Sequence, residues 1–173
     1  MAACLRMVLE SLGVLKTEEE LRVLTDSNFD SKYFPGGTEA YRVVDAAKKL
    51  GFPNATKNNL TLQELVALLI QGRFPIVYIA IRLLPNTPLQ THAVVVVEIN
   101  QEGVLIFDPV RGEIVHSQNE FNAMWQLRRG LHNFDRVSRT SIVVLLLYRS
   151  PSLTGRATAL FRLLRSRLPS RLF

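Results

Sequence analysis

His92 and Asp108 are the two residues whose types and spacing best suit chemistry. His92 precedes the apolar run Ala93–Val97, and Asp108 ends a second apolar run just before Pro109. A histidine and a carboxylate at the ends of neighbouring strands can form a general base and the group that orients it. A hydrolase of this kind also needs a nucleophile, and the only cysteine of the sequence, Cys4, lies almost at its first residue. The pair therefore indicates hydrolytic chemistry whose nucleophile has still to be found.

Metal and nucleotide chemistry are not indicated by the remaining residues. A single cysteine cannot form an internal disulfide, and it excludes a zinc site built from several thiolates. The histidines His92, His116 and His132 show no close ligand spacing, and we expect the last two on the surface. Gly36 and Gly37 are not followed by the Lys-Ser/Thr of a phosphate-binding loop. We expect no metal and no cofactor.

Helical patterns occupy the first part of the chain. Helical apolar spacing runs from Leu5 to Leu12 and stops at Gly13. Capping signatures start at Thr17 and Thr61, and a further helix begins at residues 38–39 and ends at Gly51. A polar loop is expected between the second and third of these helices, over residues 26–37.

Strand patterns dominate from Pro75 onward. Short β-branched runs are separated by Pro, Gly or Asn, and we expect strands at residues 76–81, 93–99, 104–107, 113–116 and 141–148. Ser117 and Glu120 cap one inserted helix, in which Phe121 and Trp125 are expected to face the core. The fold class predicted is α+β, with a helical half packed on an antiparallel sheet half.

The chain has 173 residues, and its charge is uneven along its length. We expect one domain over residues 1–150 and a basic amphipathic helix over residues 151–173, which contain five arginines and no acidic residue. Such a helix could contact an anionic membrane surface or an export machinery, or simply be solvated. Nucleic acid is not expected as a partner, because the segment has no recognised motif. No run is long enough for a membrane span, and no signal peptide is recognised, so we expect a cytoplasmic protein, with peripheral membrane contact through this helix as an option.

A set of local sequences, taken in order, resembles one family. The set comprises Ala3-Cys4-Leu5-Arg6-Met7-Val8-Leu9, Ser11-Leu12-Gly13, Gly37-Thr38, Leu62 to Leu65, Gly72-Arg73-Phe74-Pro75, His92-Ala93-Val94-Val95-Val96, Phe107-Asp108-Pro109 with Gly112, and Phe121 before Trp125. Over approximately residues 2–148 the chain resembles the bacteriocin-processing, double-glycine-leader cysteine peptidases, which are papain-like. The resemblance implies a papain-like fold, peptide substrates and peptide bond hydrolysis, with His92 as the base and Asp108 as its orienter.

The resemblance also fixes where the nucleophile is expected. In the family a cysteine precedes a Gly-x-Ala-Cys-Leu segment, so aligning that segment with Ala3-Cys4-Leu5 puts Met1 on the glycine and the nucleophile one residue before Met1. The glutamine that donates to the oxyanion in the family falls further upstream. Cys4 lies one helical turn, ~5 Å, from the family position, and we expect it in the core.

Three functions remain open from the sequence. The first is a cysteine peptidase domain that is inactive as written, with the true N-terminus upstream as the other explanation. The second is a peptide-binding module of peptidase descent that does not cut. The third is a basic interaction protein that acts through its C-terminal helix.

Overall fold

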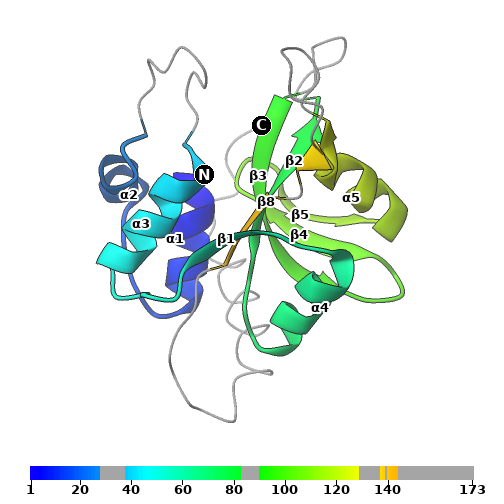
Figure 1. The fold of residues 1–173 in the computed structure, drawn as a ribbon, viewed down its shortest axis with the longest axis horizontal. Coiled ribbons are helices and arrows are strands. Elements are labelled where there is room, and N and C mark those ends of the chain that lie inside the picture. Colours follow the sequence, from blue (N-terminus) through cyan, green and yellow to red (C-terminus); the bar gives the residue numbers. More distant parts are fainter. Residues whose placement is uncertain (28–37, 83–89, 129–136, 139, 144–173) are drawn as a thin grey trace.

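The computed structural model describes residues 1–27, 38–82, 90–128, 137–138 and 140–143. A group of helices lies on one side of the molecule and a sheet with two further helices on the other (Figure 1). The residues 129–136 and 144–173 lie outside the described part, and with them His132, the end of the expected last strand and the expected basic helix. Most of the expected loop 26–37 lies outside it as well.

Three helices form the helical half: α1 (Ala2–Ser11), α2 (Glu18–Leu24) and α3 (Ala40–Lys49). The apolar stripe of α1 is buried, and α2 opens with the predicted capping box, in which Thr17 accepts from the Glu20 amide. Glycines in the left-handed region follow α1 and α3, at Gly13 and Gly51, as is common where a helix ends. These helix boundaries confirm the sequence predictions to within a few residues.

The sheet half contains six antiparallel strands in the order β1-β8-β2-β3-β4-β5 among the described residues. The strands are β1 (Thr56–Asn59), β2 (Ile76–Ile81), β3 (Gln90–Ile99), β4 (Val104–Asp108), β5 (Gly112–His116) and β8 (Thr140–Val143). A separate short pair joins β6 (Leu127–Arg128) to β7 (Val137–Ser138). The expected strands are present within the described residues, with β8 covering the start of the expected strand 141–148, whereas β1, β6 and β7 were not predicted from the sequence pattern.

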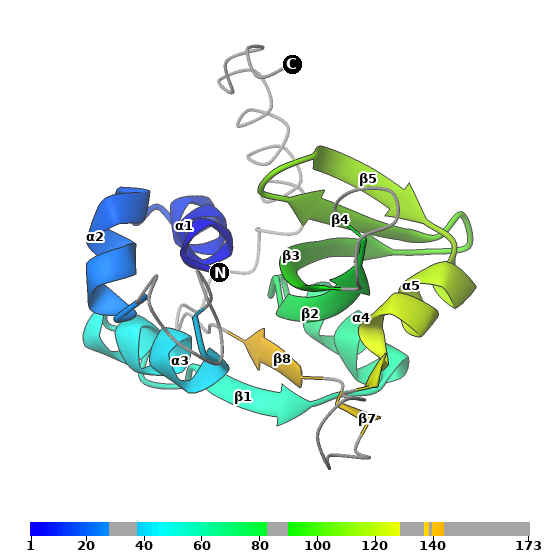
Figure 2. The same cartoon turned by 90° about the horizontal axis from the view of Figure 1, so that it is seen from above.

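Both faces of the sheet are covered, which gives three layers (Figure 2). Alternate residues of β2 and β3, such as Ile76 and Val95, pack with α1 and α3 in one core cluster. Their neighbours Val77 and Val94 belong to a second cluster, with side chains of α4 (Leu62–Ile70) and α5 (Gln118–Trp125). None of the helices in the described ranges is long and apolar enough to cross a membrane.

The inserted helix α5 is anchored by two aromatic residues. Phe121 and Trp125 are fully buried, and their ring centroids lie 5.6 Å apart. Ser117 caps the helix by accepting from the Glu120 amide, and the Glu120 carboxylate accepts from the Ser117 amide. The prediction that Phe121 and Trp125 face the core is therefore confirmed.

Candidate active site

His92 and Asp108 meet because of the register between two neighbouring strands. β3 and β4 are antiparallel, and Val95 pairs with Phe107. One residue further, this register puts Asp108 opposite Val94, and His92 shares a face with Val94 because it lies two residues earlier on the same strand. Diagonal neighbours on a sheet face are within reach of long side chains. The structure places Nε2 of His92 2.9 Å from Oδ1 of Asp108.

The carboxyl group of Asp108 is enclosed by hydrogen-bond donors. Oδ1 accepts from His92 and also from the backbone amides of Val110 at 2.8 Å and Arg111 at 3.1 Å. Oδ2 accepts from Nε of Arg111 at 2.7 Å. Burial alone would raise the pKa of Asp108, but the hydrogen bonds from His92, Val110 and Arg111 outweigh it and hold the pKa well below its usual range. Asp108 is therefore ionised at neutral pH and can only accept.

This ionisation settles the roles of the two imidazole nitrogens. Because a carboxylate has no proton to donate, the Nε2 nitrogen of His92 must carry the proton of the hydrogen bond to Asp108. In the neutral imidazole the lone pair then belongs to Nδ1, which is the nitrogen that can accept a proton. The His92 side chain is 15% exposed, so the ring is largely shielded by its neighbours.

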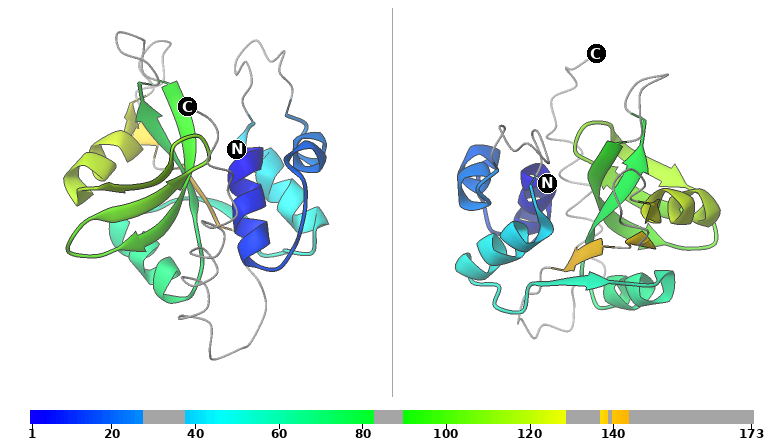
Figure 3. Two further views of the ribbon diagram at one scale, coloured as in Figure 1. Left: turned by 180° about the vertical axis from the view of Figure 1, so that it is seen from behind. Right: turned by 45° about the horizontal axis from the view of Figure 1, so that its top comes forward.

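The first turn of α1 contacts the strand that carries His92. Sγ of Cys4 donates to the carbonyl oxygen of Ala93, the residue after His92, at 3.2 Å. Both the amino terminus at Met1 and the carboxylate of Asp108 act electrostatically on the Cys4 thiol. Figure 3 shows the start of α1, marked N, on the side of the helical half that faces the sheet. The first turn of α1, near the amino end of the helix, therefore contacts the strand that carries His92 at the residue that follows it.

Cys4 itself has the environment of a core residue. Its side chain is fully buried among the apolar residues of the helical cluster. Burial is the main cause that raises the pKa of Cys4 to about 12. A reactive cysteine needs accessibility and a lowered pKa, and Cys4 has neither. The prediction that Cys4 packs in the core is confirmed.

His116 differs from the expectation of a surface residue. It ends β5 and pairs with Val104, and it is half-buried rather than exposed. Its Nε2 atom is shielded from solvent and makes no hydrogen bond. His116 is the last residue of β5, immediately before Ser117, which caps α5. It lies apart from the His92–Asp108 hydrogen bond and is given no part in the chemistry.

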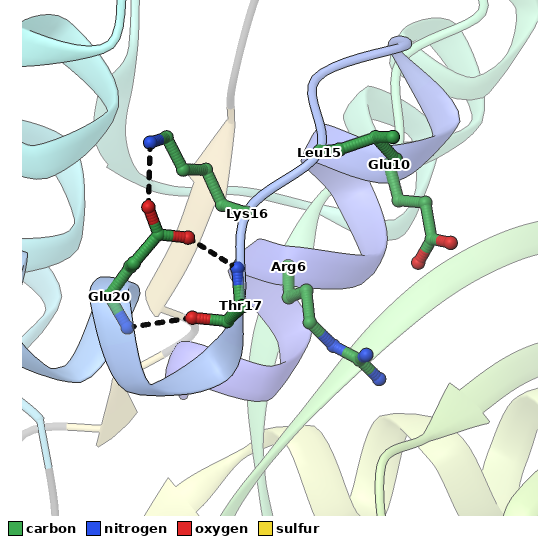
Figure 4. Close-up of a pocket in the computed structure, with 6 residues that line it drawn as sticks. All are labelled: Arg6, Glu10, Leu15, Lys16, Thr17 and Glu20. Atoms are coloured by element: carbon green, nitrogen blue, oxygen red, sulfur yellow. Dashed lines mark hydrogen bonds and ion pairs between the residues drawn. The ribbon is translucent and has the colours of Figure 1, made fainter.

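A pocket of about 230 Å³ lies elsewhere, between α1 and the start of α2 (Figure 4). Its lining residues come from the two helices and their connection: Arg6, Glu10, Leu15, Lys16, Thr17 and Glu20. Lys16 and Glu20 form an ion pair at 2.9 Å, and Glu20 also accepts from the Thr17 amide. Neither His92 nor Asp108 lines this pocket, so it is not part of the site described above.

A metal ion does not suit the His92–Asp108 pair. The carboxylate oxygens of Asp108 are already taken by donors from His92, Val110 and Arg111, and a metal would have to displace them. Within the described ranges no group of three or more His, Cys, Asp or Glu side chains comes together as a metal site. The chemistry available to the pair is proton transfer at Nδ1 of His92.

A helical half whose first helix contacts the strand of His92 with its first turn, on an antiparallel sheet that also supplies Asp108, is the arrangement expected of papain-like cysteine peptidases. The α+β class and this division into halves agree with the sequence prediction. The model of the peptidase C39 family matches residues 1–129. The chain belongs to this family, which is the bacteriocin-processing family indicated by the sequence.

Solved structures show the same fold. A C39-like peptidase from Bacillus anthracis is 16% identical, with 86% of this chain and 88% of that chain covered and a TM-score of 0.63. The peptidase domain of Streptococcus ComA, a bifunctional ABC transporter involved in a quorum-sensing pathway, is 24% identical, with 84% and 90% covered and a TM-score of 0.57. At these identities the likeness concerns the fold. No curated protein sequence matches this chain.

Proposed function

We propose that His92 and Asp108 are the base and the orienting carboxylate of a cysteine peptidase site that acts on peptides. The observation that carries the proposal is the 2.9 Å hydrogen bond from Nε2 of His92 to the ionised Asp108, beside the first turn of α1. This bond leaves Nδ1 as the basic nitrogen. The family resemblance adds that the thiol should stand at the amino end of α1, next to the position that Met1 occupies.

The reaction follows from this arrangement. Nδ1 of His92 accepts the proton of a thiol at the amino end of α1, and the helix dipole and the imidazolium stabilise the thiolate. The thiolate attacks the peptide carbonyl carbon, and the imidazolium returns the proton to the leaving amine when the C–N bond breaks. Water then cleaves the thioester, with His92 again as the base. Asp108 keeps Nε2 protonated and the ring aligned throughout.

Peptide binding without cleavage is the second candidate, and the environment of Cys4 favours it. Residues 1–173 contain one thiol, and that thiol is fully buried, donates to Ala93 and has a pKa raised to about 12, mainly by burial. The 173 residues on their own would then hold a peptide and leave it intact. Cleavage would require a thiol at the amino end of α1.

The two candidates can be separated by supplying that thiol. A Cys-Gly pair is placed ahead of Ala2, so that Gly takes the place of Met1, in a chain that also carries Cys4→Ala. A Ser-Gly pair is the matched control, and His92→Ala is made in the Cys-Gly chain. Because His92 would lower the pKa of the added thiol, we expect alkylation by iodoacetamide at pH 6 to be about 100-fold faster than in the His92→Ala chain.

The same chains are then incubated with peptides that carry a double-glycine leader. Cleavage by the Cys-Gly chain, and by neither control, would support the peptidase proposal. Equal alkylation rates with and without His92 would refute the role of His92 as base. Fast alkylation and measurable peptide binding, without cleavage of any peptide, would instead support the second candidate, peptide binding without cleavage.

The proposal includes where the protein acts and what else it contacts. The ComA domain belongs to a transporter, and a peptidase of this family would act in the cytoplasm on peptides before export. The five arginines of residues 151–173 would attach the chain to an anionic membrane surface or to an export machinery. Co-sedimentation of the full chain with phosphatidylserine vesicles, and not with phosphatidylcholine vesicles, is the expected result. Equal binding to both would refute an electrostatic attachment.

A further inference from the structure

The side chain of Arg111 makes a contact with the site that the mechanism above does not use. Its Nε atom donates to Oδ2 of Asp108 at 2.7 Å, on the carboxyl oxygen that faces away from the hydrogen bond to His92. The Arg111 side chain is 40% exposed, whereas that of Asp108 is fully buried. The guanidinium therefore meets the buried carboxylate from the solvent side.

The position of Oδ1 does not depend on this side chain. Oδ1 is held by the backbone amides of Val110 and Arg111 as well as by His92. Backbone amides are present with any residue other than proline, so a substitution at position 111 keeps them. What the guanidinium adds is the hydrogen bond to Oδ2 and one positive charge.

That charge changes what His92 experiences. A bare carboxylate beside an imidazolium stabilises the charged form strongly. With the guanidinium of Arg111 on its other oxygen, Asp108 still offers Oδ1 as an acceptor, but the Asp–Arg unit carries no net charge. A peptidase histidine must both take a proton and give it back to the leaving group, so an imidazolium that is stabilised too strongly would retain the proton.

We propose that Arg111 is a positioning residue that tempers the basicity of His92 by neutralising the far side of Asp108. The inference rests on the proposed role of His92 as the base. The charged groups in hydrogen-bond contact with the pair are the carboxylate of Asp108 at the end of β4 and the guanidinium of Arg111 in the turn after it. On α1, the amino terminus and Asp108 both act electrostatically on the Cys4 thiol, whose Sγ contacts the residue after His92. Opposite His92 on β2 stands Ile79, which is apolar.

The test is an NMR titration of the imidazole signals in the full chain. The sequence has three histidines, and the His92 signal is assigned from its loss in His92→Asn. In Arg111→Met the titration midpoint of His92 should rise by about one pH unit, because the neutralising charge is gone. Arg111→Gln, which keeps a donor for Oδ2 without the charge, should give the same rise. Arg111→Lys should stay within about 0.3 units of the wild type.

Arg22 provides a matched control. It also donates to a carboxylate, that of Glu18, and its side chain is 41% exposed, close to the 40% of Arg111. Arg22→Met removes the same charge from α2 and should leave the His92 midpoint unchanged. A purely structural role of Arg111 would lower thermal stability without moving this midpoint.

The outcomes are separable from those of the peptidase test. If neither Arg111→Met nor Arg111→Gln raises the His92 midpoint, or if Arg22→Met raises it as much, the inference is overturned. Should Arg111→Met fail to fold, the Arg111→Gln variant decides. The titration requires no thiol and no activity, so a chain that cleaves nothing can still show the effect of Arg111, and an active chain can still lack it.

Discussion

Cys4 should be almost inert to alkylating reagents in the folded protein. With its pKa raised to about 12, mainly by burial, its thiolate fraction at pH 8 is ~0.0001, against ~0.24 for a free cysteine with a pKa near 8.5. Since the thiolate is the reacting form, alkylation should be slowed about 2,000-fold by ionisation alone. The full burial of the side chain slows it further, because the reagent has no access.

The assay is alkylation by iodoacetamide at pH 8, followed by intact mass. The native chain should gain no adduct over the time in which a small thiol reacts completely, and the chain in 6 M guanidinium should gain one. Cys4→Ala is the control, and it should gain none in either condition. Labelling of the native chain at the rate of a free thiol would refute the reasoning. If the substitution His92→Ala then slowed that labelling, Cys4 itself would be the thiol from which His92 takes the proton.

Three further predictions concern stability. Phe121→Ala should lower the free energy of unfolding in urea by about 3–5 kcal/mol, because the ring is fully buried. Val110→Ala is the control: the Val110 side chain is 76% exposed, so the change should stay within about 0.5 kcal/mol. Equal losses for the two variants would contradict the burial of Phe121 in the core. Gly103→Ala should lower the free energy of unfolding by about 2 kcal/mol or more, because φ is +150° and an added Cβ would lie 2.3 Å from the carbonyl oxygen of His116. An unchanged melting temperature would argue against this turn. The lowered pKa of Asp108 means that its ionisation stabilises the folded state at pH values above the ordinary carboxyl pKa of about 3.9. The unfolding free energies of the wild type and of Asp108→Asn should therefore converge as the pH falls below about 4. A difference that stays constant with pH would show that ionisation of Asp108 is not responsible.

Sequence patterns predicted the elements whose signals are local. The capping boxes at Thr17, Thr61 and Ser117 each start a helix in the structure, because the side chain of the first residue and the glutamate three positions on satisfy each other's amides. β1 was missed because its sequence, Thr-Lys-Asn-Asn, has neither apolar residues nor alternation. It is a strand only because β8 pairs with it, and no local pattern carries that information.

In the candidate site, too, the residues with a local sequence signal were predicted and the others were not. His92 and Asp108 could be found from their positions at the ends of apolar runs, and the structure brings them into hydrogen-bond contact. Arg111 was missed, although an arginine three residues after the aspartate of an Asp-Pro pair has a spacing that lets a turn fold it back onto the carboxylate. The shielding of the Nε2 atom of His116 was not predicted either, because the alternation of β5 tells which face a residue is on and not what covers it.

The place of β8 in the sheet has a consequence for how the chain folds as it leaves the ribosome. β8 lies between β1 and β2, and Thr56 pairs with Val143 near the end of the described chain. At synthesis rates of about 5–20 residues per second, β1 and one edge of β2 remain unpaired for several seconds until β8 has been synthesised. β3 and β4, which carry His92 and Asp108, are a hairpin and need no such delay. The hydrogen bond between His92 and Asp108 can thus form early in synthesis, whereas the open edge of β2 is exposed to aggregation and to chaperones until β8 has been made.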